Sequence, residues 1–348
     1  MKKLLFAMSL IWGTLHILSC GAKVAVENPE PGNWLMMDTP VDVSLRGLSP
    51  VTEHIVWASG ADGTWLLTMD GGKSWKHGVI DGLDTVDFRD IEGFDASTAI
   101  AISAGQPAVI YKTTDGGENW KNVYQGKADD FLNGMAFRND KIGYAYGDPI
   151  NGKWTIIKTE DGGDTWIRSE SSPKAIEGEA GFAASGSIMV VDQDNLYLAS
   201  GGKESNIYYS HNRGDQWAVT HTPMTQGEAS QGIFSLTIID NSNIIAVGGD
   251  FEDPNNHTAN VTLSHDNGLT WEPNKGNTPS GYRSGVAYYP RLHWVVAVGP
   301  SGTDYSTNGG EHWESLGTES FHTVKRSKSN GSIWASGADG KVATLEIL

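Results

Sequence analysis

The octapeptide "TTDGGENW" at Thr113–Trp120 is one of six copies of a pattern that starts with Ser or Thr, has Asp or Asn third and Gly fifth, and ends in Trp. Successive tryptophans of the pattern lie 45, 46, 51, 54 and 42 residues apart, which is the length of a four-stranded propeller blade. The Asp or Asn side chain of such a turn accepts backbone N–H groups, and the glycine adopts the left-handed conformation. We therefore interpret the third residues as structural turn residues rather than catalytic groups: Asp70, Asp115, Asp161, Asn212, Asp266 and Asn308.

A second theme, a strand followed by a hairpin turn, sets the number of blades. It occurs seven times, and the heptapeptide "WASGADG" begins both its first and its last copy, at Trp57–Gly63 and Trp334–Gly340. The chain ends one strand after the last copy, and Trp34 lies about one blade length before the first octapeptide. The sequence thus predicts an all-β, seven-bladed β-propeller of four-stranded blades, closed by an N-terminal strand that completes the C-terminal blade. The expected blades within the domain 33–348 are 41–82, 83–127, 128–172, 173–222, 223–274, 275–317 and 318–348 plus 33–38.

The N-terminus predicts export. Residues 1–19 place Lys2 and Lys3 before an apolar run that ends in small residues, as in a signal peptide. The following "ILSCG" resembles a bacterial lipobox, which implies a lipid on Cys20 and a tether over residues 20–32. With Gly21 next, we expect a protein of the outer membrane of a Gram-negative bacterium that touches the membrane only through its lipid. An ordinary cleaved signal peptide with a free cysteine is the alternative.

Charge and motif spacing exclude several classes of partner. The net charge of −17 repels phosphate backbones, so we expect no nucleic acid ligand. No His-x-x-His spacing and no glycine-rich nucleotide loop occurs in the chain, so we predict no metal and no cofactor. We also expect a monomer, because a closed propeller needs no partner to fold.

The octapeptides resemble the Asp-box, or BNR, repeat of sialidases and other β-propellers. The chain after the tether is similar, in repeat motif and blade length, to the BNR-like propellers related to the photosystem II assembly and stability factor. This resemblance implies seven blades and a basic patch on the ring that binds protein. Arg46, Arg89 and Arg283 would be the counterparts of that patch.

The same arginines are expected on one face by propeller geometry. The loops that enter the innermost strands share a face with the hairpins joining second and third strands, whereas the octapeptides lie opposite. We expect the innermost strand of the fourth blade near residues 178–184. Three arginines at the mouth would bind a carboxylate or sulfate, unless each pairs with an acid of a neighbouring blade. The ligand-binding candidates are Arg46, Arg89, Asp90, Asn133, Arg283 and His322.

Long insertions in the third to fifth blades supply possible catalytic acids. A sialidase-like hydrolase needs an arginine triad, a Tyr–Glu nucleophile pair and an acid, and the chain lacks the Arg-Ile-Pro signature of that family. The same acids could hold Ca²⁺ through oxygen, although their spacing matches no defined metal loop. The catalytic candidates are Glu179, Asp148, Asp250 and Tyr282.

Two functions follow from these observations. We expect a lipid-anchored binding or assembly module whose loop-rich face and channel mouth hold a protein or glycan ligand, anionic ligands included. The alternative is a carbohydrate-active enzyme, either a glycoside hydrolase or a polysaccharide lyase, that uses the arginines and carboxylates of the mouth.

Overall fold

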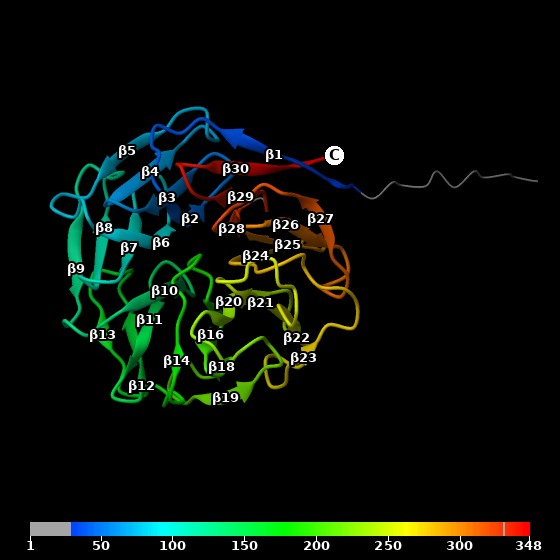
Figure 1. Ribbon diagram of the computed structural model, residues 1–348. Coiled ribbons are helices and arrows are strands. Elements are labelled where there is room, and N and C mark those ends of the chain that lie inside the picture. Colours follow the sequence, from blue (N-terminus) through cyan, green and yellow to red (C-terminus); the bar gives the residue numbers. More distant parts are fainter. Residues whose placement is uncertain (1–28, 330) are drawn as a thin grey trace, which may run out of the picture.

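The computed structural model describes residues 29–329 and 331–348. These residues form seven sheets around a central axis (Figure 1) and contain no helix, so none of them belongs to a helix that could cross a membrane. The prediction of an all-β, seven-bladed propeller is confirmed.

Every blade is an antiparallel sheet of four strands that run in chain order from the axis outward, with β1 as the outermost strand of the seventh. In that order the blades are: β2 (Leu45–Pro50), β3 (Val56–Gly60), β4 (Thr64–Thr68), β5 (Lys76–Val79); β6 (Asp87–Gly93), β7 (Ala99–Ala104), β8 (Val109–Thr113), β9 (Lys121–Gln125); β10 (Leu132–Phe137), β11 (Gly143–Ile150), β12 (Lys153–Thr159), β13 (Ile167–Arg168); β15 (Met189–Asp192), β16 (Asn195–Ala199), β18 (Asn206–Ser210), β19 (Ala218–His221); β20 (Gln231–Ile238), β21 (Ile244–Asp250), β22 (Val261–Ser264), β23 (Glu272–Pro273); β24 (Gly285–Tyr289), β25 (Trp294–Gly299), β26 (Gly302–Ser306), β27 (Glu314–Gly317); β28 (Thr323–Arg326), β29 (Ile333–Ser336), β30 (Val342–Ile347), β1 (Pro31–Met37).

The ring is closed by β1, which pairs with β30 of the C-terminal blade (Figure 1). Trp34 lies opposite Leu345 in this ladder, its ring centroid is 4.9 Å from that of Phe321, and its indole N–H donates to Thr303 Oγ1 at 3.1 Å. The closing strand therefore bonds to its own blade and also contacts the sixth. Closure removes the open sheet edge that an incomplete seventh blade would leave.

The octapeptide turns show why their pattern recurs. In the second blade, Asp115 Oδ1 accepts the backbone N–H of Asn119 at 2.9 Å, and Thr113 Oγ1 accepts that of Gly117 at 3.0 Å. Hydrogen bonds from Asn119 hold the pKa of Asp115 at about 2. Gly117 has a φ of +84°, and a Cβ there would lie 2.3 Å from the Trp65 ring. Trp120, the last residue of the turn, packs against Trp57 and Trp65 of the first blade.

The duplicated heptapeptide forms two equivalent Asp-Gly hairpins. Asp62 and Gly63 have φ values of +56° and +67°, and Asp339 and Gly340 have +54° and +66°, as a two-residue hairpin turn requires. The N–H of Gly63 donates to Val86 O at 2.7 Å, and that of Gly340 donates to Val43 O at 2.8 Å. Each hairpin is thus bonded to the segment that leads into the following blade, which explains the recurrence of this heptapeptide as a structural feature.

The apolar core lies between neighbouring blades. Between the fifth and sixth blades, for example, the facing strands bury a continuous cluster: Ile245, Val247, Val261, Leu263, Val286, Val295, Ala297 and Trp313. A short bridge joins the fourth and fifth blades, where β14 (Glu179–Ala180) pairs with β17 (Gly201–Gly202) and Gly201 of β17 pairs with Gly232 of β20.

The fourth blade departs from the expected pattern at its innermost strand. That strand is β15, about ten residues later than the expected start near residues 178–184. The segment 181–187, "GFAASGS", instead extends from the fourth blade to the first, second and seventh blades; we call it the channel plug. Side chains of those blades donate to four consecutive carbonyl oxygens of the plug: Arg89 to Ala183, Arg46 to Ala184, Thr323 to Ser185 and Lys325 to Gly186.

Candidate functional site

A cavity of about 460 Å³ lies at the channel mouth, and all seven blades contribute to it. We call it the upper cavity. The channel plug supplies part of its wall through residues 181–184. Its other lining residues are Arg46, Arg89, Phe131, Asp148, Phe234, Phe251, Tyr282, Ser284, Pro300 and His322.

Two of the three predicted arginines meet at this cavity. Arg46 is partly buried and donates through Nη1 to Ala184 O at 3.1 Å. Among the described residues, no carboxylate lies within ion-pair distance of it. Arg89 donates through Nε to Asp87 Oδ2 at 2.7 Å and, in a longer contact of 3.4 Å, through Nη1 to Ala183 O. Burial, and next the charge of Arg89, lowers the pKa of Arg46. The cavity therefore holds two neighbouring positive charges, of which Asp87 pairs with that of Arg89.

His322 adds a neutral imidazole to this positive region. Burial, followed by the charges of Arg46 and Arg89, lowers the pKa of His322 to about 3. The ring is thus uncharged at neutral pH, and the positive charge of the cavity comes from the guanidinium groups alone.

Another part of the cavity wall is aromatic. The rings of Phe182 and Phe234 stack with centroids 3.9 Å apart and an interplanar angle of 10°. Phe251 meets both edge-on at about 6 Å, and Tyr282 packs edge-on against Phe234 at 4.7 Å. Because Phe251 is 47% exposed, this wall offers an apolar surface to a ligand beside the arginines.

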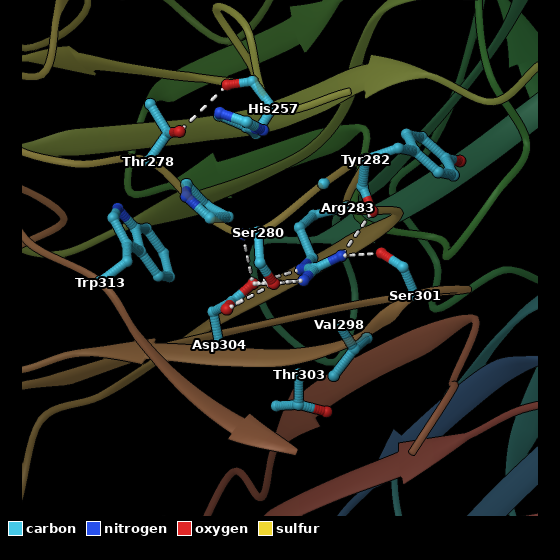
Figure 2. Close-up of polar contacts among 12 residues, drawn as sticks. His257, Thr278, Ser280, Tyr282, Arg283, Val298, Ser301, Thr303, Asp304 and Trp313 are labelled. Carbon is cyan, nitrogen blue, oxygen red and sulfur yellow. Dashed lines mark hydrogen bonds and ion pairs between the residues drawn. The ribbon is translucent and has the colours of Figure 1, made fainter. Parts of the chain in front are cut away.

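Arg283, the third predicted arginine, is not part of the cavity wall. Figure 2 shows its guanidinium enclosed by Ser280, Ser301 and Asp304. It is fully buried and forms an ion pair with Asp304, with Nε 2.7 Å from Oδ2. Its remaining N–H groups donate to Tyr282 O, Ser301 Oγ and Ser280 Oγ at 2.7–2.9 Å. All five donors are satisfied by groups of the sixth blade and of the segment that leads into it, so the expectation that Arg283 binds ligand is corrected: it stabilises its own blade.

Asp90 and Asn133 also lie away from the cavity surface. The Asp90 carboxylate is buried and accepts the N–H groups of Ile91 at 3.0 Å and Met135 at 2.8 Å. A Cβ on Gly186 of the plug would lie 2.2 Å from Asp90 Oδ1, so the plug packs directly on this carboxylate, and burial raises its pKa. Asn133 is 2% exposed and donates to Asp148 Oδ1 at 2.8 Å. Both residues support the site without facing a ligand.

Of the four catalytic candidates, Asp148 and Tyr282 line the cavity. Asp148 Oδ1 also accepts the N–H of Gly181 at 2.9 Å, and burial raises the pKa of Asp148. Glu179 is buried elsewhere and accepts hydrogen bonds from Ser200, Asn206, Tyr208 and the N–H of Ile176. Asp250 accepts Gln231 Nε2 at 3.0 Å and the N–H of Glu252 at 2.9 Å, outside the lining. The cavity therefore presents one carboxylate of the predicted set rather than a pair.

The described residues contain no cluster of three or more His, Cys, Asp or Glu side chains that could hold a metal ion. Sequence reasoning missed the channel plug and the aromatic wall. The signal available for the wall was Phe251, which stands in a long insertion of the fifth blade, whereas Phe182 lies in the segment 178–184 that was expected to form an innermost strand.

The chain resembles known proteins over most of its length. Residues 26–166 match the family model described as photosynthesis system II assembly factor YCF48. The chain is 24% identical over 291 residues to the photosystem II assembly lipoprotein Ycf48 of Synechococcus sp., covering 72% of this chain and 80% of the relative. It is 26% identical over 304 residues to the same protein of Trichormus variabilis, covering 74% and 82%.

Solved structures agree on the fold. A structure of YCF48 bound to D1 peptide superposes with a TM-score of 0.62 at 16% identity, over 89% of this chain and 96% of the other. YCF48 from Cyanidioschyzon merolae gives a TM-score of 0.62 at 18% identity, over 90% and 98%. The predicted resemblance to these BNR propellers is thus confirmed.

The predicted location is corrected by the same relatives. Both are named photosystem II assembly lipoproteins, which points to association with a thylakoid or plasma membrane rather than the outer membrane of a Gram-negative bacterium. The predicted signal peptide and the lipidation site Cys20 lie outside the described residues.

Proposed function

Since the chain resembles Ycf48 in sequence and in fold, we propose that it is a protein-binding assembly module that holds a segment of a partner protein in the upper cavity. Arg46 and Arg89 bind a carboxylate of that segment, and the wall formed by Phe182 and Phe251 takes an adjacent apolar side chain. The observation that carries the proposal is the meeting of two guanidinium groups and an exposed aromatic wall in one cavity.

The donors left on the two arginines suit a carboxylate. A guanidinium has five N–H donors in a planar fork that matches the two oxygens of a carboxylate. Arg46 donates one hydrogen bond to Ala184 O, and Arg89 donates to Asp87 and to Ala183 O, so both retain free donors. A charge-assisted hydrogen bond in such a site contributes about 1.5–3 kcal/mol. A ligand carboxylate would also offset the repulsion between the two cations.

The relatives favour a protein ligand over a glycan, because YCF48 is known in a complex with D1 peptide. The word lipoprotein in the names of both curated relatives supports a lipid on Cys20, which would keep the module at the membrane where it meets its partner. We do not propose a two-carboxylate glycosidase mechanism, since such a mechanism needs two acids flanking the bond and one predicted acid, Asp148, lines the cavity.

An affinity-capture experiment tests this function. The protein is used as bait against a detergent-solubilised membrane fraction in three forms: wild type, Arg46→Gln/Arg89→Gln and Arg138→Gln/Arg213→Gln. The last form is the matched control, because Arg138 and Arg213 also carry two charges but pair with Asp194 away from the cavity. We expect one partner to be retained by wild type and the control and lost with the cavity variant. Equal retention by all three forms would rule out the proposed site.

A further inference from the structure

The channel has a second cavity on the far side of the plug. It has a volume of about 320 Å³ and is lined by the downstream ends of six innermost strands, β6, β10, β15, β20, β24 and β28. We call it the lower cavity. Gly186 and Ser187 of the plug form its roof, whereas residues 181–184 of the same segment line the upper cavity. The plug therefore separates two cavities at opposite ends of the channel.

The wall of the lower cavity combines apolar and polar groups, which suits a ligand with an apolar body and a charged end. The side chains come from five blades and include Met135, Phe137, Met189, Leu236, Tyr288 and Val324. The volume falls near the lower end of the range of small-molecule sites, about 300–1,000 Å³. A ligand with one or two rings, or a short aliphatic chain, matches such a space.

The charged residues of the lower cavity are mainly basic, although the protein carries a net charge of −17. Lys325, Arg326 and Lys328 follow one another on and just after β28, and Glu92 is the acid that faces them from β6. Lys328 is already paired, with its Nζ 2.5 Å from Glu92 Oε1 and 2.6 Å from Gly93 O. Lys328 and Glu92 balance one another, so the positive charges of Lys325 and Arg326 remain without a counter-charge in the lining.

Lys325 and Arg326 retain donors for an anion. Lys325 Nζ donates to Gly186 O at 2.9 Å, which leaves two of its three N–H donors. Within the described part of the chain, no Asp or Glu lies within ion-pair distance of Lys325 or Arg326. Asp90 is a neighbour of Lys325, but both of its oxygens accept backbone N–H groups, from Ile91 and Met135. Burial lowers the pKa of Lys325, so a bound anion would stabilise its charged form.

The geometry points to a second ligand site in the lower cavity, for a small organic anion whose carboxylate, sulfonate or phosphate is held by Lys325 and Arg326 while its apolar body contacts Met135, Phe137 and Leu236. A purely structural role explains Lys325, which holds the plug through Gly186. It does not explain Arg326, which is exposed, lines the same cavity and has no ion-pair partner in the described residues.

A matched pair of fluorescent probes tests this site. Anilinonaphthalene sulfonate has an aromatic body and one anionic group, and phenylnaphthylamine has the same body without the sulfonate. Each probe is titrated into the full chain carrying Arg46→Gln/Arg89→Gln, so that the upper cavity does not contribute a guanidinium site. We expect saturable binding of the sulfonate, with an affinity at least about tenfold higher than that of the neutral probe, as one charge-assisted contact provides.

Three further variants, made in the same background, locate the bound anion. Lys325→Met and Arg326→Gln should each lower the affinity for the sulfonate by about tenfold or more and leave the neutral probe unchanged. Arg291→Gln is the control, because Arg291 is exposed on the β24–β25 hairpin and does not line the cavity; it should change neither affinity. Arg326→Gln removes an exposed side chain and so keeps the test valid if Lys325→Met impairs folding. Equal affinity for both probes, or unchanged sulfonate binding in Arg326→Gln, would overturn the proposal.

Discussion

The interior of the sixth blade and the upper cavity both hold arginine side chains, in different surroundings. In the sixth blade, Arg283 is fully buried and its charge is matched by Asp304, which is 2% exposed. At the cavity, Arg46 and Arg89 are partly exposed and repel one another; Arg46 donates to a carbonyl oxygen of the plug, and Arg89 donates to Asp87 and, in a longer contact, to a second plug carbonyl. A carbonyl accepts a hydrogen bond but does not neutralise a charge. The first region therefore stabilises the ring, and the second retains a positive field for a ligand.

The comparison predicts its largest effect at the buried Arg283–Asp304 pair of the sixth blade. Arg283→Met should lower the free energy of unfolding by about 3–5 kcal/mol, because it leaves the Asp304 carboxylate buried without its cation. The measurement is urea denaturation followed by tryptophan fluorescence. The double variant Arg283→Met/Asp304→Leu should recover most of the loss, because it removes both charges together. A loss below about 1 kcal/mol in the single variant would mean that the pair contributes little and would break the comparison.

At the cavity the effect should fall on binding instead. Arg46→Gln and Arg89→Gln should each lower the affinity for the captured partner by about tenfold or more, which is the contribution of one charge-assisted hydrogen bond. Their unfolding free energies should stay within about 1 kcal/mol of wild type, since partly exposed cations are removed. Both quantities are measured on the same preparations, by surface plasmon resonance and urea denaturation. A loss of stability as large as that of Arg283→Met would show that these arginines are structural.

The positive charges of Arg46 and Arg89 should be visible in the titration of His322. Its folded pKa of about 3 lies below the ordinary 6.5. A histidine with a lowered folded pKa stabilises the protein above pH 6.5 and loses that contribution as the pH falls towards 3. Arg46→Gln/Arg89→Gln should raise the pKa of His322, although not to 6.5, because burial is the larger cause. Nuclear magnetic resonance of the imidazole signals measures the shift, and an unchanged pKa would show that the arginine charges are already screened.

The smallest expected effect concerns Asp87, the carboxylate beside Arg89. The pair is about one third exposed and so contributes only about 0.2–1 kcal/mol. Asp87→Asn removes a competitor for the guanidinium and should strengthen partner binding up to about fivefold. Equilibrium binding at low and physiological salt measures the change, which should shrink as salt screens it. Weaker binding in Asp87→Asn would indicate that Asp87 orients Arg89 for the ligand.

The fold could be predicted because the sequence motifs that form its turns and hairpins are repeated. Each octapeptide turn uses the same Asp or Asn acceptor and glycine conformation, so the same interpretation applied to all six turns. The hairpin near Trp334 has no octapeptide after it, which indicated that the N-terminal strand closes the ring. The blade position of Arg46 and Arg89 followed from the same repeat. Features that recur in every blade could therefore be predicted from the sequence.

The site could be predicted only in part, because its decisive features occur once. The plug "GFAASGS" has small residues and no strand pattern, so nothing in it indicates that its carbonyls meet Arg46 and Lys325 from other blades. Arg283 has the same residue type and a similar position in its blade as Arg46. Arg283 is buried because it pairs with Asp304 on the third strand of the same blade, and a single sequence does not indicate that contact.

The most direct test of the central claim is a binding cycle on the upper cavity. A peptide from the captured partner is titrated calorimetrically in two forms, with its carboxylate free and with that carboxylate converted to an amide, into wild type and into Arg46→Gln/Arg89→Gln. The account predicts that the amide binds wild type at least about tenfold more weakly than the acid, whereas the variant binds both forms equally. Equal affinities of acid and amide for wild type, or the same preference for the acid in the variant, would contradict the account.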